Sequence, residues 1–235
     1  MIQTGRELAS LCKRAATQFK TLYIRGCFGA PMNDSNKKRY TNNHAYNKEE
    51  SRTKKILAAS PNTFGFDCVC FIKGLLWGWE GDTGHVYGGA AYQSNGVPDI
   101  TADSMIKMCK EVSEDFASVS VGEAVWIPGH IGIYVGDGMA VECTHRWQDG
   151  VQLTAVHNIA PISGMNGRSW KKHGKLPWIT YDAYVQEVSD SVADAVTILA
   201  KEVIAGKFGN GEARKEKLYR LIQDRVNELC REEQS

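Results

Sequence analysis

The apolar residues of this chain form longer runs that predict helices and shorter runs that predict strands. Residues 69–79 carry apolar side chains on every face of a helix, which predicts a buried helix. Residues 132–135 are mostly β-branched or aromatic and predict a short strand. The glycine-flanked tripeptide 136–138 predicts a hairpin turn, after which residues 139–141 begin a return strand. We therefore expect an α+β fold in which a buried helix packs on a mostly antiparallel sheet.

The pattern changes after Tyr181. From residue 193, apolar residues recur at helical spacing, and glycines separate two helical segments. We expect a larger domain over residues 1–184, a linker over 185–192 and a small helical domain over 193–235. A helical unit of this length is small for a core of its own.

Candidate chemistry begins at the start of the predicted buried helix. Gly65 permits a turn, Asp67 is a favourable N-cap residue, and Cys68 then lies in the first helical turn. Unpaired amide groups and the helix dipole favour a thiolate there, which is typical of a nucleophile. The alternative is a small, inert core cysteine, which is the interpretation we prefer for Cys70. A Cys-x-Cys pair could also bind metal, but zinc sites use wider spacings and a second pair, so neither a metal nor a cofactor is expected.

An imidazole and a carboxylate are expected near one end of the predicted hairpin. His130 heads the first strand, and Glu142 lies on the return strand. If the strands pair around the turn, the carboxylate can fix the tautomer of the imidazole, as the third member of a catalytic triad does. The alternative is a structural histidine. A cysteine, a histidine and an acid on separate elements are the parts of a nucleophilic hydrolase.

These segments resemble the NlpC-type family of cysteine peptidases, which cut bacterial cell-wall peptides. The resemblance covers roughly residues 20–180 and depends on the combined spacing of its motifs. The motifs are Asp67-Cys68 at the start of an apolar helix, the strand His130-Ile131-Gly132-Ile133-Tyr134, the polar residue Glu142, and the upstream segment Leu22-Tyr23-Ile24-Arg25-Gly26.

The resemblance implies a papain-like catalytic domain and assigns roles to its residues. Cys68 is the expected nucleophile, His130 the base and Glu142 the orienting group. The Tyr23 hydroxyl and the backbone N–H of Cys68 are candidates to stabilise the oxyanion. In some relatives, the aspartate before the cysteine (here Asp67) and a serine after it hold the free amine of the substrate.

The chain departs from the family pattern in three places. Glu142 stands where the family commonly has histidine, and Val69 replaces the serine, which argues against a required free amine. Residues 28–63 form a long polar insertion between the tyrosine and cysteine motifs. A long polar loop of this kind is often functional, and the alternative is a solvated surface excursion.

The tail resembles a small wall-binding repeat found at the C-terminus of certain phage lysozymes. Residues 200–214 and the ending 222–229 carry the resemblance, which spans roughly residues 193–230. It implies binding to the muropeptide, with Phe208 as a stacking surface and Arg214 as a carboxylate ligand. The alternatives are that Phe208 fills a small core, that Arg214 forms a surface ion pair, and that the tail only packs or mediates dimers.

Composition narrows the possible partners and location. A net charge of +1 over 235 residues gives no electrostatic case for nucleic acid. No apolar run is long enough to span a membrane. Seven cysteines without framework spacing suit a protein made in a reducing cytosol, and the first residues lack the regions of a signal peptide. We expect synthesis in the bacterial cytoplasm and action at the wall after release, a profile that fits phage endolysins; phage or bacterial origin and oligomeric state stay open.

The expected function is hydrolysis of an amide bond in peptidoglycan by Cys68, His130 and Glu142. Two bonds fit equally well: the one after D-glutamate in the stem peptide, and the one between the sugar lactate and L-alanine. A non-catalytic wall-binding protein, and an acyltransferase or lipid hydrolase on the same scaffold, are the alternatives.

Overall fold

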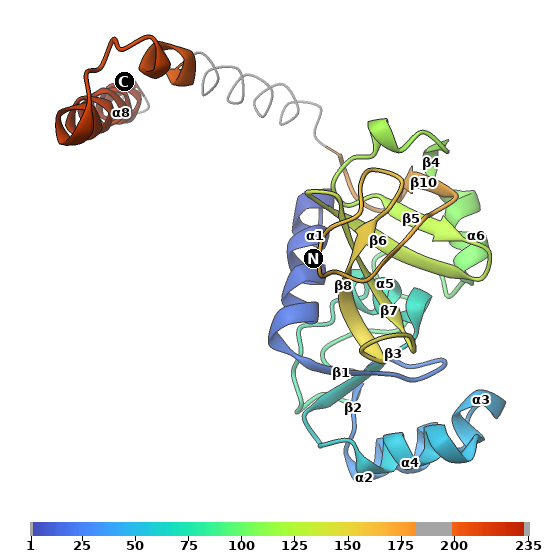
Figure 1. The fold of residues 1–235 in the computed structure, drawn as a ribbon. Coiled ribbons are helices and arrows are strands. Elements are labelled where there is room, and N and C mark those ends of the chain that lie inside the picture. The colour runs from blue at the N-terminus through green and yellow to red at the C-terminus, as the bar shows by residue number, and fades with distance from the viewer. Residues whose placement is uncertain (1, 182–198, 233–235) are drawn as a thin grey trace. The chain divides into compact units, whose positions relative to one another are not determined.

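The computed structural model describes residues 2–181 and 199–232, which fall into two compact units, Met1–Tyr181 and Asp182–Ser235 (Figure 1). The predicted linker over residues 185–192 lies outside the described residues. Within the described residues, no helix is long and apolar enough to cross a membrane.

A seven-stranded sheet forms the centre of the first unit. Every pairing in it is antiparallel except that between its last two strands, so the predicted mixture of helices with a largely antiparallel sheet is confirmed. In spatial order the strands are β4 (Lys110–Ser113), β10 (Lys172–Lys175), β5 (Ala124–Ile127), β6 (His130–Gly136), β7 (Met139–Thr144), β8 (Gly150–Val156) and β9 (Gly167–Arg168).

A smaller, three-stranded sheet lies beside this one, with β3 between β1 and β2. Its strands are β1 (Lys20–Tyr23), β2 (Phe28–Pro31) and β3 (Thr63–Phe66). Between β2 and β3 the chain forms the helices α2 (Asp34–Tyr40), α3 (Ala45–Lys48) and α4 (Glu50–Ala58), which lie together at one end of the unit (Figure 1).

The expectation of a polar loop over residues 28–63 is therefore wrong. Asn33 and His44 cap short helices with their side chains, and Tyr40 and Ile56 pack in a small separate core with Ile24. The apolar positions are too few and too widely spaced to show a helical period, which is why the sequence looked like a loop.

Helices α1 (Gly5–Gln18) and α5 (Cys68–Leu76) pack on one face of the large sheet, and α6 (Ala102–Met108) packs near β5 and β10. A short 3₁₀ helix spans Phe116–Ser118. Alternate residues of β6, such as Ile131 and Ile133, join the core under α1 and α5, whereas Tyr134 joins a second cluster on the opposite face. By the same alternation, the side chain of His130 lies on the face that carries Tyr134.

Helix α5 is buried along its whole length, as its apolar pattern predicts. Its position depends on Gly74, where a Cβ atom would lie 2.8 Å from the carbonyl oxygen of Phe28. The missing side chain allows β2 to approach the last turn of the helix closely.

The second unit is helical in its described part. Residues 199–204 are helical, and α8 (Gly211–Glu232) follows after a turn. Glycines with positive φ at Gly206, Gly209 and Gly211 separate the two helical segments, as the sequence predicts.

Candidate active site

Asp67 fixes the backbone on which the candidate nucleophile stands. Its side chain caps α5 by accepting a hydrogen bond from the Cys70 N–H at 2.8 Å, and its other oxygen accepts from the Gly26 N–H at 2.8 Å. One buried carboxylate therefore joins the start of α5 to the segment after β1, and Cys68 is the first residue of the helix.

The Cys68 thiol lies against the backbone on either side of His130. Its sulfur contacts the Gly129 carbonyl oxygen at 4.0 Å, and the Ile131 and Val69 N–H groups point toward it. Burial, reinforced by the negative charge of Asp67, raises the pKa of this thiol to about 12, although the amide groups act in the opposite direction. The thiol is thus protonated at neutral pH, and a base must remove its proton before it can attack.

A histidine–carboxylate pair occupies the neighbouring strands. His130 Nε2 lies 2.6 Å from Glu142 Oε2, and the imidazole is 15 % exposed while the carboxylate is fully buried. Both side chains are on the face of the sheet opposite α5, because Gly132, two residues after His130, pairs with Glu142. As the sequence predicts, the hairpin brings these two side chains together.

Residues from distant segments hold the pair in place. Arg168 on β9 donates from Nε to Glu142 Oε1 at 3.0 Å and forms an ion pair with Oε2 at 2.6 Å. The Thr154 hydroxyl donates to Oε1 at 2.9 Å. Burial alone would raise the pKa of Glu142, but His130, Arg168 and Thr154 lower it below its ordinary value. Glu142 is therefore a fixed anion.

Aromatic packing orients the imidazole. The Trp170 ring stacks on His130 with centroids 5.7 Å apart and planes 12° from parallel. Gly132 makes room for it, since a Cβ atom there would lie 3.2 Å from the Trp170 ring and 2.9 Å from the Val141 carbonyl oxygen. The Arg168 guanidinium lies 5.3 Å from the ring centroids of both Trp170 and Trp147.

The turn before His130 is also fixed. Asp103 on α6 accepts hydrogen bonds from the Gly129 N–H and from Trp126 Nε1, both at 2.8 Å. The Gly129 carbonyl oxygen is the atom that the Cys68 sulfur contacts, so Asp103 sets the approach of the thiol to this strand.

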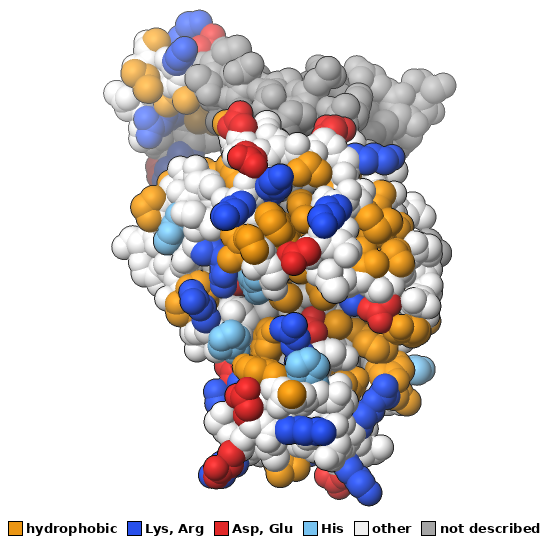
Figure 2. Space-filling model, turned by 90° about the vertical axis from the view of Figure 1, so that its right-hand side faces the viewer, with side chains coloured by type: hydrophobic (Ala, Val, Ile, Leu, Met, Phe, Trp, Pro, Cys, Tyr) orange, Lys and Arg blue, Asp and Glu red, His pale blue; other side chains and the backbone are white. Residues whose placement is uncertain are grey.

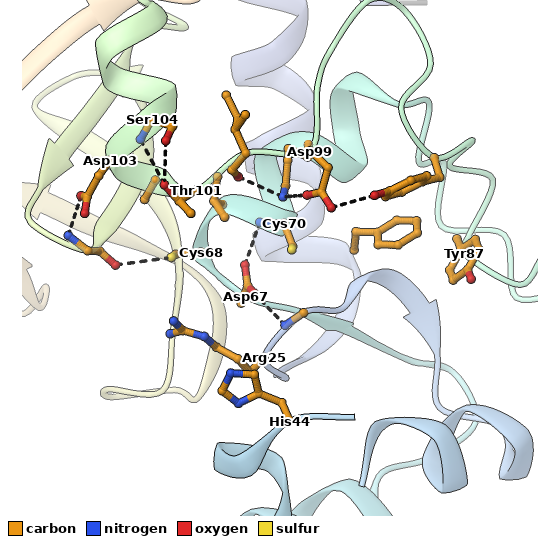
Figure 3. A pocket seen from close by; sticks show the side chains of 18 of the residues that line it. Arg25, His44, Asp67, Cys68, Cys70, Tyr87, Asp99, Thr101, Asp103 and Ser104 are labelled. Carbon is orange, nitrogen blue, oxygen red and sulfur yellow. Dashed lines mark hydrogen bonds and ion pairs between the residues drawn. The ribbon is translucent and has the colours of Figure 1, made fainter. Parts of the chain in front are cut away.

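An open cleft of about 1010 Å³ lies beside Cys68 (Figure 3). Two opposed sides are visible in Figure 3: Thr101, Asp103 and Ser104 lie on one side of Cys68, and Arg25 and His44 lie on the other. Phe28, Tyr87 and Tyr92 extend the cleft away from Cys68 as an aromatic surface. Figure 2 shows one face of the molecule, on which basic and histidine side chains lie next to hydrophobic ones.

The sequence-predicted residues are not all in the same position relative to this cleft. Cys68 and Asp67 line it, and so does Cys70, which the sequence assigned to the core; His130 does not line it. No hydrogen bond joins the Cys68 sulfur to the His130 ring among residues 2–181. Tyr23 is buried, with its hydroxyl beside Arg25 and within electrostatic reach of Cys68.

The remaining predicted residues, Phe208 and Arg214, belong to the second unit. Both side chains are half-buried there. The neighbouring carboxylate of Glu212 pairs with Lys215 at 2.7 Å.

Four contributors escaped the sequence reasoning: Thr154, Arg168, Trp170 and Asp103. They come from segments far from the cysteine and histidine motifs, and none has a local signal. In the described part of the chain, no group of three or more His, Cys, Asp or Glu residues is arranged to hold a metal ion.

Comparison with known families places one part of the chain. Residues 198–230 match the CW_7 repeat, a cell-wall repeat, in agreement with the resemblance seen in the tail. The repeat suggests a cell-wall-associated protein. No curated protein matches the chain.

Proposed function

We propose that this protein is a thiol-dependent peptidoglycan hydrolase with a papain-like catalytic unit and a wall-binding tail. The observation that carries the proposal is the placement of Cys68 at the start of α5, against the strand that bears the buried His130–Glu142 pair. The CW_7 repeat supports the choice of substrate, because it suggests association with the cell wall.

His130 is the base in this proposal. Its Nε2 is engaged by Glu142, so Nδ1 is the nitrogen left to accept the Cys68 proton, and the transfer requires the imidazole to move toward the thiol from its place beside Glu142 and Trp170. The thiolate then attacks the amide carbonyl carbon, and the protonated imidazole gives its proton to the leaving amine. Water hydrolyses the resulting thioester by the same proton transfers in reverse, which regenerates the thiol.

Two donors are available for the developing oxyanion. The backbone N–H of Cys68 belongs to the free amide groups of the first helical turn. The Tyr23 hydroxyl is the second, and because burial raises the pKa of Tyr23 above its ordinary value, it stays protonated and able to donate.

The decisive experiment is mass spectrometry of fragments released from purified walls. Wild-type protein should release new amino and carboxyl termini, and Cys68→Ala should release none. A new terminus at D-glutamate would make the enzyme an endopeptidase, and a free lactate carboxyl would make it an amidase. Fragments with new reducing sugar ends, or none at all, would refute the proposal.

A further inference from the structure

The helices inserted between β2 and β3 hold one short segment of backbone beside the nucleophile. Asn47 on α3 is fully buried, and its side-chain amide pairs with both backbone groups of Arg25: it accepts from the N–H at 3.0 Å and donates to the carbonyl oxygen at 2.9 Å. Asn43 accepts a further bond from Asn47 at 2.9 Å. Asn47 thus acts toward Arg25 as a neighbouring strand would.

A second buried residue of the insertion holds the backbone two positions earlier, at Tyr23. Arg52 on α4 donates from Nη2 to the Tyr23 carbonyl oxygen and from Nη1 to both carboxylate oxygens of Asp149, at 2.8 and 2.7 Å. Asp149 in turn accepts the Tyr23 N–H through its backbone carbonyl at 3.0 Å. The insertion therefore fixes residues 23–25 through two polar side chains, Asn47 and Arg52, that are largely shielded from water.

The side chain held by this arrangement is a cation in the cleft. The Arg25 guanidinium is exposed, lines the cleft with Cys68, and has the Tyr23 hydroxyl as its hydrogen-bond partner. Within residues 2–181, no carboxylate lies at ion-pair distance from it. Figure 3 shows the Arg25 side chain facing the same cleft as Cys68, and its positive charge opposes the effects of burial and Asp67 on the pKa of the thiol.

His44 supplies a second donor on the same side. Its Nδ1 accepts the Tyr46 N–H at 3.1 Å, so the proton of the neutral ring is on Nε2, and the residue is exposed in the cleft. Arg39, the other arginine of the cleft, is occupied differently: it bonds the Tyr87 hydroxyl at 2.6 Å and lies over two tyrosine rings.

The acidic residues of the cleft are already satisfied by other groups. Asp99 pairs with Lys73 and accepts the Tyr92 hydroxyl. Asp67 and Asp103 accept N–H groups from the backbone and from an indole. Among the charged and imidazole side chains that the structure describes in the cleft, Arg25 and His44 keep N–H donors for a ligand on their side of Cys68, and these favour an anionic group.

We propose that Arg25, assisted by His44, binds a carboxylate of the substrate peptide next to the amide bond that Cys68 attacks. This proposal rests on the peptidase function proposed above. The planar guanidinium presents paired N–H donors that match a carboxylate, whereas a neutral carboxamide at the same place offers one acceptor and no charge. The α2–α4 insertion holds the Arg25 guanidinium at a fixed position relative to the Cys68 thiol.

The test uses two stem peptides that differ only in carrying D-glutamate with a free α-carboxylate or with an α-carboxamide. Wild-type protein should cleave the acid with the higher kcat/KM. Arg25→Gln should lose at least about tenfold on the acid and much less on the amide, and Arg25→Lys should lose an intermediate amount. Lys48→Gln, which removes an exposed cation of the same insertion outside the cleft, should change neither.

A second measurement separates this inference from the hydrolase proposal. Calorimetric titration of Cys68→Ala with the same two peptides should show tighter binding of the acid, and Arg25→Gln in that background should abolish the difference. Equal binding of acid and amide would overturn the carboxylate site even if the enzyme cuts both peptides. Equal losses on both peptides in Arg25→Gln, together with slower alkylation of Cys68 by neutral iodoacetamide, would also overturn it, because the guanidinium would then act on the thiol. Failure of wild-type protein to cut either peptide or purified walls would refute the hydrolase function alone.

Discussion

Two buried thiols line the same cleft, and their surroundings separate their roles. Cys68 lies against the backbone that flanks His130, whereas the side chain of Cys70 is near Asp67 and Lys73. We expect Cys68→Ala to abolish wall lysis and Cys70→Ala to keep most of it. Turbidity of purified walls measures both, and inactivation by iodoacetamide that tracks modification of Cys70 would contradict the assignment.

The Cys68 thiol should show its dependence on His130 in a pH profile. Because burial and Asp67 raise the pKa of Cys68 to about 12, the thiolate cannot form near neutral pH unless the proton has an acceptor. In His130→Ala, alkylation of Cys68 should keep rising with pH throughout the range in which the protein stays folded. In the wild type, the rate of alkylation should reach its plateau at a much lower pH. Identical profiles would show that His130 is not the base.

Glu142 should orient His130 without taking up a proton. Its pKa is lowered despite burial by His130, Arg168 and Thr154, so it stays ionised at all working pH values. Glu142→Gln should reduce turnover by roughly 100-fold or more while the protein still folds and binds walls.

The chain offers a matched control for this variant. Glu123, just before β5, forms a second buried histidine pair with His173 on β10, and neither residue lines the cleft. Glu123→Gln should affect stability but leave turnover of the folded protein unchanged. Similar rate losses in both variants would point to a general loss of structure.

At the scale of elements, the sequence predicts those parts of the site that have a local signal. The buried helix α5 begins with a capping aspartate, and the hairpin of β6 and β7 has its turn residues, so both are recognisable in isolation. Arg168 and Trp170 reach the site only through the pairing of β9 with β8 and the return of the chain to β10. Such long-range placement leaves no periodic trace in the sequence, so these residues could not be predicted.

The insertion was misread for a related reason. Its helices are short and mostly polar, and their stability depends on two buried polar side chains, Asn47 and Arg52, which composition alone assigns to the surface. Buried side chains of this kind are visible only once their partners are known.

The contribution of Arg52 to the stability of the insertion can be measured by unfolding. Its partner Asp149 has a side chain only 14 % exposed, so Arg52→Met would leave a largely buried carboxylate with Lys55 alone. We expect a loss of about 3 kcal/mol in the free energy of unfolding by urea. Lys54→Ala, which breaks the exposed pair with Glu50 on the same helix, should cost less than about 0.5 kcal/mol. Equal effects would show that α4 is not held by the buried pair.

At the scale of the whole molecule, the two units should divide catalysis and wall affinity. A chain ending at Tyr181 keeps the half-buried Tyr181 side chain, whose hydroxyl accepts from the Leu176 N–H and donates to the Gly122 carbonyl oxygen, so it should fold and cleave small soluble muropeptides. It should bind and lyse intact walls more weakly, because a tethered wall-binding repeat raises the local concentration of substrate. Pull-down of both chains with purified walls tests this, and equal binding would leave the repeat without an affinity role.

The buried thiols also bear on how such an enzyme would survive outside a cell. Burial raises the pKa of each of the six cysteines of residues 2–181, including Cys68, the proposed nucleophile. Oxygen and peroxides attack the thiolate rather than the thiol. In a wall hydrolase of this kind most thiols would be protonated and would oxidise slowly. Its rate of oxidation in solution should therefore depend on how far His130 deprotonates Cys68, not on the number of cysteines.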